Sequence, residues 1–156
     1  MALEVYENKK DEKYLKSAFK GVNRGIDLIR QMKELESLVE TKYEINPINV
    51  REIIESVAPL HQISCSIEGN CLVQADQAIK SVIENIMVNS IKHGKADKIN
   101  FKLLTHEKTC EIIIYDNGAG IPPEAREKIF EAGFGYGVDR GTGLGLYIVK
   151  KTIDRY

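Results

Sequence analysis

Three glycines and a threonine lie in the stretch RGTGLGLYIVKK, residues 140–151, just before apolar residues with helical spacing. Such a loop exposes successive backbone N–H groups and the positive end of the helix dipole, an arrangement that suits a phosphate. It lacks the Lys-Ser/Thr pair of a P-loop and is not a GxGxxG after a strand, which disfavours those two nucleotide folds. A helix-start loop without a ligand is the alternative.

A row of polar residues occupies an otherwise apolar helical segment. Asn85, Asn89 and Lys92 stand at i, i+4 and i+7, so they share one face of the helix. An asparagine carbonyl is a neutral oxygen ligand that suits Mg²⁺ when phosphates supply the negative charge, and Lys92 can bind a phosphate directly. A solvated helix face is the alternative.

The stretch YDNGAGIP, residues 115–122, places Asp116 at the end of an apolar strand, with Gly118 and Gly120 following. A carboxylate at this position can accept a hydrogen bond from the exocyclic amine of adenine, whereas guanine would present a carbonyl oxygen to it. The two glycines would let a flat ring approach the backbone. Taken alone, DNG is also a common turn.

These residues need elements to position them. Apolar residues at three- and four-residue steps from Glu12 to about Lys42 predict one amphipathic helix of roughly 45 Å. Because a small domain covers only part of such a helix, part of its apolar stripe is expected to face another helix or chain; a helix lying wholly across its own domain is the alternative. Pro47 predicts a linker near residues 43–48, which divides the chain into 1–44 and 45–156.

The second part alternates helical and extended patterns. The expected elements are a short helix ended by Pro59, a weak hairpin over residues 63–76, a helix capped by Asp76 and ending at Gly94, strands KINFKLL and CEIIIY, a short helix after Pro123, and a closing helix from about Gly143. Ile99, Phe101 and Leu103 are expected on one face of the first of those two strands.

Composition excludes several classes of function. The 156 residues include 22 basic and 23 acidic ones, so no overall field favours nucleic acid or an anionic membrane. The sequence has no membrane-spanning stretch and no signal peptide. Cys65, Cys71 and Cys110 lack zinc-site spacing and are expected to be buried or incidental thiols of a cytoplasmic protein, with a membrane tether of the whole protein left open.

Together, these motifs resemble a known family. ENIMVNSIKHG, DNGAGIP, IFEAGFG and GTGLGL are similar to the N, G1, F and G2 boxes of sensor histidine kinases. Over residues 48–156, the resemblance implies an α+β fold: a two-layer α/β sandwich of the Bergerat type, whose mixed sheet is backed by helices and whose last hairpin is absent from this chain. The preceding helix resembles the second helix of the family's dimerisation and phosphoacceptor hairpin.

The resemblance also implies ligands and roles. It implies ATP with Mg²⁺: Asn89 binds the metal, Asn85 and Lys92 lie near the phosphates, and His93 lies at the pocket edge. Asp116 holds the adenine amine, while Phe130 anchors a lid over residues 131–140. The remaining expected cofactor-binding residues are Gly118, Gly120 and Ile121 near the ring and Gly141, Thr142, Gly143, Leu144 and Gly145 around the phosphates.

The expected phosphoacceptor histidine is not present in this chain, because His61, His93 and His106 lack the family's acceptor context. The implied partners are ATP or ADP, a phosphoacceptor helix of the same or a partner subunit, a response regulator and a second copy in a homodimer, and no nucleic acid. Asn85 stands where hydrolases of the superfamily carry a glutamate, which favours phosphoryl transfer to histidine over hydrolysis. An anti-sigma-type serine kinase and a non-catalytic nucleotide-binding module are the alternatives.

Overall fold

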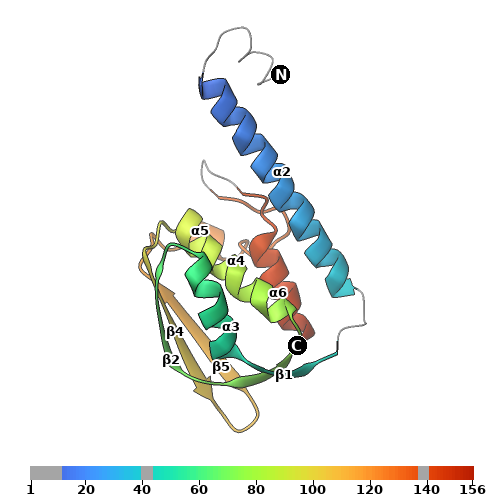
Figure 1. Cartoon of the computed structure of the whole chain (residues 1–156), viewed down its shortest axis with the longest axis vertical. Helices are drawn as coiled ribbons and strands as arrows, with labels where there is room; N and C mark the ends of the chain where they lie inside the picture. The colour runs from blue at the N-terminus through green and yellow to red at the C-terminus, as the bar shows by residue number, and fades with distance from the viewer. Residues whose placement is uncertain (1–11, 40–43, 137–140) are drawn as a thin grey trace.

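The computed structural model describes residues 12–39, 44–136 and 141–156. A three-stranded sheet is covered on one side by helices α3, α4 and α6, and the long helix α2 runs beside them (Figure 1). The elements in chain order are α2 (Glu12–Val39), β1 (Asn46–Asn49), α3 (Val50–Val57), the 3₁₀ helix η1 (Ala58–Leu60), β2 (Ser64–Gly69), β3 (Leu72–Ala75), α4 (Ala78–Lys92), β4 (Lys98–Thr105), β5 (Cys110–Asp116), α5 (Pro123–Arg126) and α6 (Gly145–Arg155).

The expected α+β sandwich is confirmed. The larger sheet has the order β2-β4-β5, with β2 parallel and β5 antiparallel to β4. Ile99, Phe101 and Leu103 of β4 point into the core, where they pack with residues of α3 and α4 such as Ile54 and Met87. Among the described residues no strand pairs with the outer edge of β5.

The expected hairpin over residues 63–76 is wrong in its pairing. Strands form on both sides of Gly69, but β2 pairs with β4 while β3 pairs with β1. The NPIN segment, expected as a linker, is therefore β1, with Pro47 opposite Gln74. Alternation predicts a strand but not its partner, because pairing depends on which sheet can bury each face.

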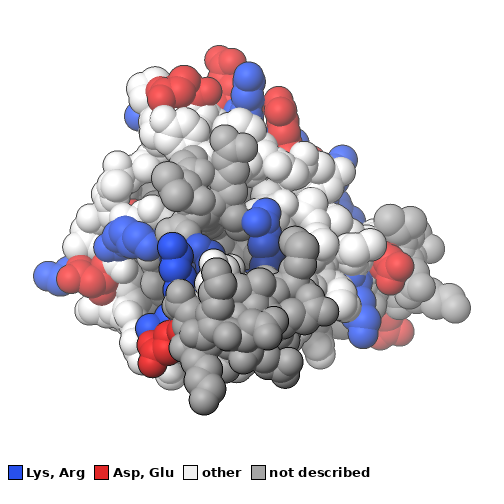
Figure 2. Space-filling model, turned by 90° about the horizontal axis from the view of Figure 1, so that it is seen from above, with Lys and Arg blue, Asp and Glu red and all other residues white. Residues whose placement is uncertain are grey.

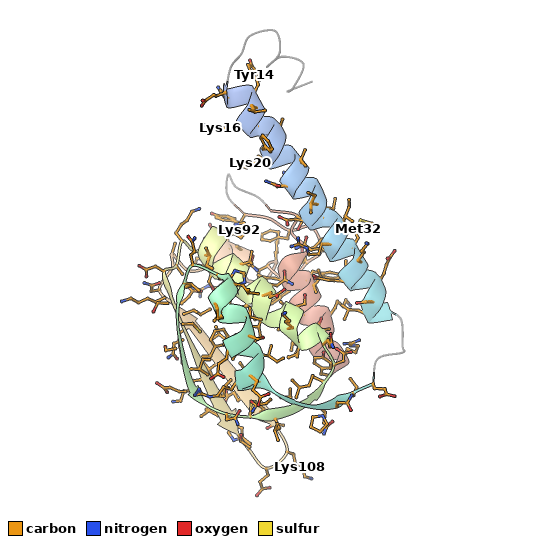
Figure 3. The ribbon with its side chains drawn as sticks, viewed as in Figure 1. Tyr14, Lys16, Lys20, Met32, Lys92 and Lys108 are labelled. Atoms are coloured by element: carbon orange, nitrogen blue, oxygen red, sulfur yellow. A yellow bond between two sulfur atoms is a disulfide. The ribbon has the colours of Figure 1, made fainter. Side chains whose placement is uncertain are left out.

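Helix α2 exposes its apolar side. Phe19, Val22 and Ile29 keep 62%, 58% and 60% of their surface exposed. Met32 lies on the side of α2 that faces away from α4 and α6 (Figure 3). The polar side of α2 instead faces the rest of the chain, through contacts described below. Much of the apolar stripe is therefore not covered by the described part of the chain, although Leu35 is half-buried. That this part faces another helix or chain stays a prediction.

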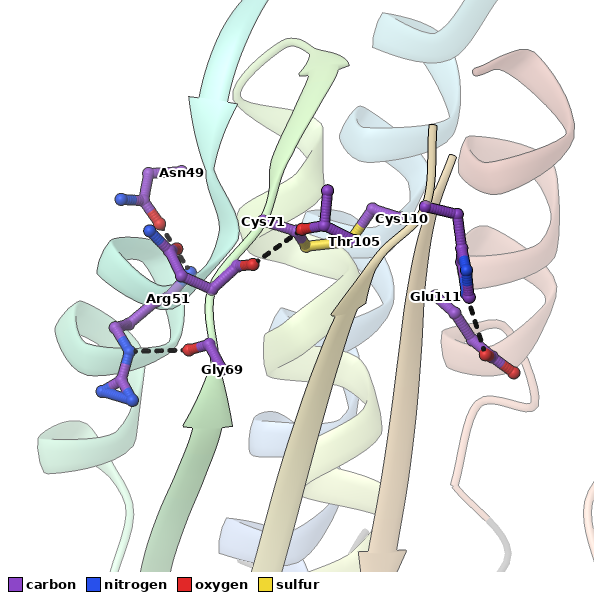
Figure 4. The surroundings of a disulfide bond; sticks show 9 residues. Asn49, Arg51, Gly69, Cys71, Thr105, Cys110 and Glu111 are labelled. Carbon is purple, nitrogen blue, oxygen red and sulfur yellow. Dashed lines mark hydrogen bonds and ion pairs between the residues drawn. A yellow bond between two sulfur atoms is a disulfide. The ribbon is translucent and has the colours of Figure 1, made fainter. Parts of the chain in front are cut away.

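Two of the three cysteines form a disulfide, contrary to the expectation of free thiols. Cys71 and Cys110 have Cα atoms 6.0 Å apart and join the start of β3 to the start of β5 (Figure 4). Beside them, Thr105 donates a hydrogen bond of 2.9 Å to the carbonyl of Asn70. Cys65 remains a free thiol, and burial raises its pKa. The bond therefore links the two sheets.

Reducing this disulfide should lower the free energy of unfolding by roughly 2–4 kcal/mol, because the unfolded chain regains the freedom of a long loop. Urea unfolding of the wild type with and without dithiothreitol measures the effect. Cys110→Ser is the matched control, since its stability should not respond to reductant. A wild type whose midpoint is the same in both buffers would show that the bond contributes nothing.

Candidate nucleotide site

The polar row of α4 lies beside its buried stripe. Asn85 and Asn89 are half-buried, whereas Ile83 and Met87 are fully buried in the core. The Asn85 amide donates to the Ser81 carbonyl at 3.0 Å and to the Ser81 hydroxyl at 3.2 Å. The Asn89 amide nitrogen is buried and has no hydrogen-bond partner within the described part of the chain. Burying an amide N–H group without a hydrogen-bond partner costs free energy, so Asn89 is a candidate ligand-binding residue.

Asp116 is held by the end of α4. The Ser90 hydroxyl donates to one carboxylate oxygen at 2.8 Å, and the Gly118 N–H donates to the other at 2.9 Å. A Cβ at Gly118 would lie 2.6 Å from the Gly94 carbonyl oxygen, so this turn requires glycine for its close approach to α4. The Asp116 side chain is therefore oriented while its remaining lone pairs stay available.

The glycine-rich loop packs on the same part of α4. A Cβ at Gly145 would lie 2.8 Å from the Asn85 side-chain oxygen, and one at Gly141 would lie 3.5 Å from the His93 ring. Gly143 has φ +73° and accepts a 3.1 Å hydrogen bond from the Gly133 N–H. The closing helix begins at Gly145 and not at Gly143, since Gly143 adopts the left-handed conformation that ends the loop.

The other predicted residues lie at the margin of this arrangement. Gly120 has φ +72° and open space beside it. Ile121 and Phe130 are 44% and 40% exposed. The expected lid falls partly outside the described residues, because its positions 137–140 are not described. Its first part is joined to α5 by the Tyr136 hydroxyl, which donates to Glu124 at 2.9 Å.

Sequence reasoning missed the polar contacts of α2 with this site. Arg24 donates to the Gly141 carbonyl at 3.1 Å, and Asp27 lies 3.7 Å from the Lys92 ammonium. Thr142 donates a hydrogen bond to Gln31. The signal was present in the sequence as polar residues at steps of three and four along the helix, opposite its apolar stripe.

The predicted residues thus converge on one region. Helix α4 and the two residues after it contact the Asp116 turn through Ser90 and Gly94, and the glycine-rich loop through Asn85 and His93. Several Lys and Arg side chains lie on the face of the molecule that is seen from above (Figure 2). Combined with a sheet backed by helices, this arrangement defines an α/β-sandwich domain with a candidate site for an anionic nucleotide.

The chain belongs to the histidine kinase-, DNA gyrase B- and HSP90-like ATPase family, whose model matches residues 74–156, more than half of the chain. The sensor-type histidine kinase PrrB of Mycobacterium leprae is 27% identical over 114 residues, 66% of this chain and 25% of that protein. The sensor histidine kinase YcbM of Bacillus subtilis is 27% identical over 146 residues, 86% of this chain and 47% of that protein.

A solved structure of a mycobacterial sensor histidine kinase, MprB, matches with a TM-score of 0.62 and 25% identity over 71% of this chain and 79% of that one. The chain is therefore an ATP-binding catalytic domain of the histidine kinase type. It spans about a quarter to a half of the two curated relatives named above. No described helix combines the length and apolar character needed to cross a membrane.

Proposed function

We propose that the site around α4 binds ATP with Mg²⁺ and presents its γ-phosphoryl group to a histidine on a helix outside this chain. The observation that supports this most directly is the contact of one helix with both the Asp116 turn and the glycine-rich loop, through Ser90 at 2.8 Å and through Asn85. These are the two motifs expected to bind opposite ends of the nucleotide.

The adenine end is assigned to the Asp116 turn. Each carboxylate oxygen of Asp116 carries one internal hydrogen bond and can accept another, which suits the exocyclic amine of adenine. Gly120 leaves open space for the ring, whereas the glycine at position 118 allows the turn to approach Gly94. The exposed Ile121 side chain offers an apolar surface beside the ring. A hydrogen-bonded carboxylate of this kind discriminates adenine from guanine.

The phosphate end is assigned to the loop before α6. The N–H groups of this loop and the positive end of the α6 dipole suit an anion, with Lys92 and Asn85 beside them. His93 lies next to Gly141 and closes one side. The phosphate-binding residues proposed here are Asn85, Lys92, His93, Gly141, Thr142, Gly143, Leu144 and Gly145, with Phe130 at the base of the lid.

Asn89 is the residue proposed to hold Mg²⁺. The atom proposed to bind the metal is its side-chain carbonyl oxygen, while its unpaired buried amide nitrogen is a donor that can bind a phosphate oxygen. The described residues contain no cluster of three or more His, Cys, Asp or Glu side chains that could hold a metal. A neutral amide fits a metal whose other ligands are phosphate oxygens and water. When bound, Mg²⁺ neutralises charge on the transferred phosphoryl group.

Transfer to histidine is favoured over hydrolysis. The amide of Asn85, bonded to Ser81, cannot act as a general base for water. Positioning and charge neutralisation then supply the catalysis. The exposed apolar side of α2 fits the second helix of a hairpin that packs in a homodimer, with the phosphoacceptor helix on the same or the partner subunit and a response regulator as the next acceptor.

The test is to incubate the chain with γ-labelled ATP and Mg²⁺, alone and with a phosphoacceptor hairpin of a sensor histidine kinase. We expect no label on the chain alone and acid-labile, base-stable label on the hairpin, as for phosphohistidine. Acid-stable label on serine would support the serine-kinase alternative. Nucleotide binding without any transfer would contradict the kinase proposal and support a binding module.

A further inference from the structure

One face of α2 is fitted to the proposed phosphate site. Arg24, Asp27, Gln31 and Glu34 follow one another at steps of three or four residues and therefore lie on the same side of the helix. Each has a partner in the nucleotide-binding part of the chain: the Gly141 carbonyl, Lys92, Thr142 and Ser81, respectively. We refer to Asp27 and Gln31, with their two partners, as the α2 clamp.

The partners of the clamp are groups that phosphates would use. Lys92 of α4 is one of the residues proposed to bind phosphate, and its ammonium group lies 3.7 Å from the Asp27 carboxylate. The Thr142 hydroxyl, in the middle of the glycine-rich loop, donates to the Gln31 side chain. Asp27 also adds a negative charge at the place where a triphosphate would carry several.

The contacts that hold α2 against α4 and the glycine-rich loop, here called the seat of α2, are weak enough to break. In the clamp ion pair the side chains of Lys92 and Asp27 are 62% and 42% exposed, and exposed pairs of this kind contribute little to stability. Much of the apolar side of α2 takes no part in these contacts, since Phe19 and Ile29 are largely exposed, although Leu35 is half-buried. Further along, Leu38 of α2 and Ile148 and Thr152 of α6 line a cavity of about 250 Å³.

We propose that the α2 clamp opposes nucleotide binding: while α2 is seated, Lys92 and Thr142 are held by the helix, and a triphosphate must displace Asp27 and Gln31 to reach them. This inference rests on the proposed function of the site. The position of α2 relative to α6 is then coupled to nucleotide affinity. Because this coupling is reciprocal, bound nucleotide weakens the contacts that hold α2 in place.

Two single substitutions test the clamp, each measured by titration calorimetry with Mg-ATP. Asp27→Asn and Gln31→Ala should each raise the affinity for Mg-ATP by roughly 2- to 5-fold, because a nucleotide no longer has to displace a weak contact. Gln31→Ala changes no charge, so its effect separates the contact from a general loss of negative charge. Glu36→Gln is the matched control, because it removes one acidic charge from an exposed position of the same helix, and its affinity should equal that of the wild type.

The outcomes distinguish failure of the proposed nucleotide site from failure of the α2 clamp. A wild type that binds no Mg-ATP would overturn the proposed function itself. A wild type that binds, with Asp27→Asn and Gln31→Ala unchanged or weaker, would overturn the clamp alone. An increase shared by Asp27→Asn and Glu36→Gln but absent from Gln31→Ala would also overturn it, since charge alone would then explain the change. Arg24 stays unaltered because its positive charge would attract phosphates with or without the clamp.

Discussion

Replacing Asp116 with asparagine should weaken ATP binding by roughly 10- to 100-fold, as expected for the loss of a hydrogen bond to a charged acceptor. The carboxylate is oriented by Ser90 and Gly118, and it offers only acceptors to the ring. An asparagine of the same shape would present an amide N–H₂ to one of these neighbours or to the adenine amine. Titration calorimetry with ATP measures the change.

The specificity of the Asp116 variant is as informative as its affinity. The wild type should prefer ATP to GTP, and Asp116→Asn should lose most of that preference, because a carbonyl on the base no longer faces a negative charge. Asp154→Asn, an exposed position on α6, is the charge-matched control and should bind like the wild type. Equal affinity of wild type and Asp116→Asn for ATP would refute the assignment of adenine to this turn.

Local patterns in the sequence predicted the elements that surround the site. The apolar stripe of α4 and the alternation of β4 are strong signals, since each element buries one face among apolar residues. The site motifs follow from the same elements, because Asp116 ends β5 and Gly145 begins α6. Chain order alone therefore indicated where polar groups would emerge from these elements.

The sequence did not predict which residues far apart in the chain would contact each other. Cys71 and Cys110 lie 39 residues apart, and nothing in their spacing shows that β3 and β5 start side by side. The role of Ser90 was also hidden, because a small hydroxyl residue on a helix has no distinctive pattern until Asp116 is placed 2.8 Å away. The same holds for Gln31, whose partner Thr142 lies 111 residues further along the chain.

Asn89→Ala should abolish most of the Mg²⁺-dependent part of nucleotide binding, a loss of roughly 10- to 100-fold or more, comparable to losses from removing groups that support a metal site. Its effect on stability should be small, within about 0.5 kcal/mol. The reason is that the buried Asn89 amide nitrogen has no internal hydrogen-bond partner to lose. Calorimetry with ATP in the presence of Mg²⁺ or EDTA measures the first effect, and urea unfolding measures the second.

Asn85→Ala is the informative comparison, because this asparagine lies one turn away on the same helix face. Its amide donates to both the carbonyl and the hydroxyl of Ser81, so truncation should cost about 1–2 kcal/mol of stability. The two variants should therefore be distinguishable. Asn89→Ala should keep the stability of the wild type but bind nucleotide without dependence on Mg²⁺, whereas Asn85→Ala should be less stable. If circular dichroism showed Asn89→Ala to be unfolded, the residue would be structural, and its assignment as the metal-binding residue would be wrong.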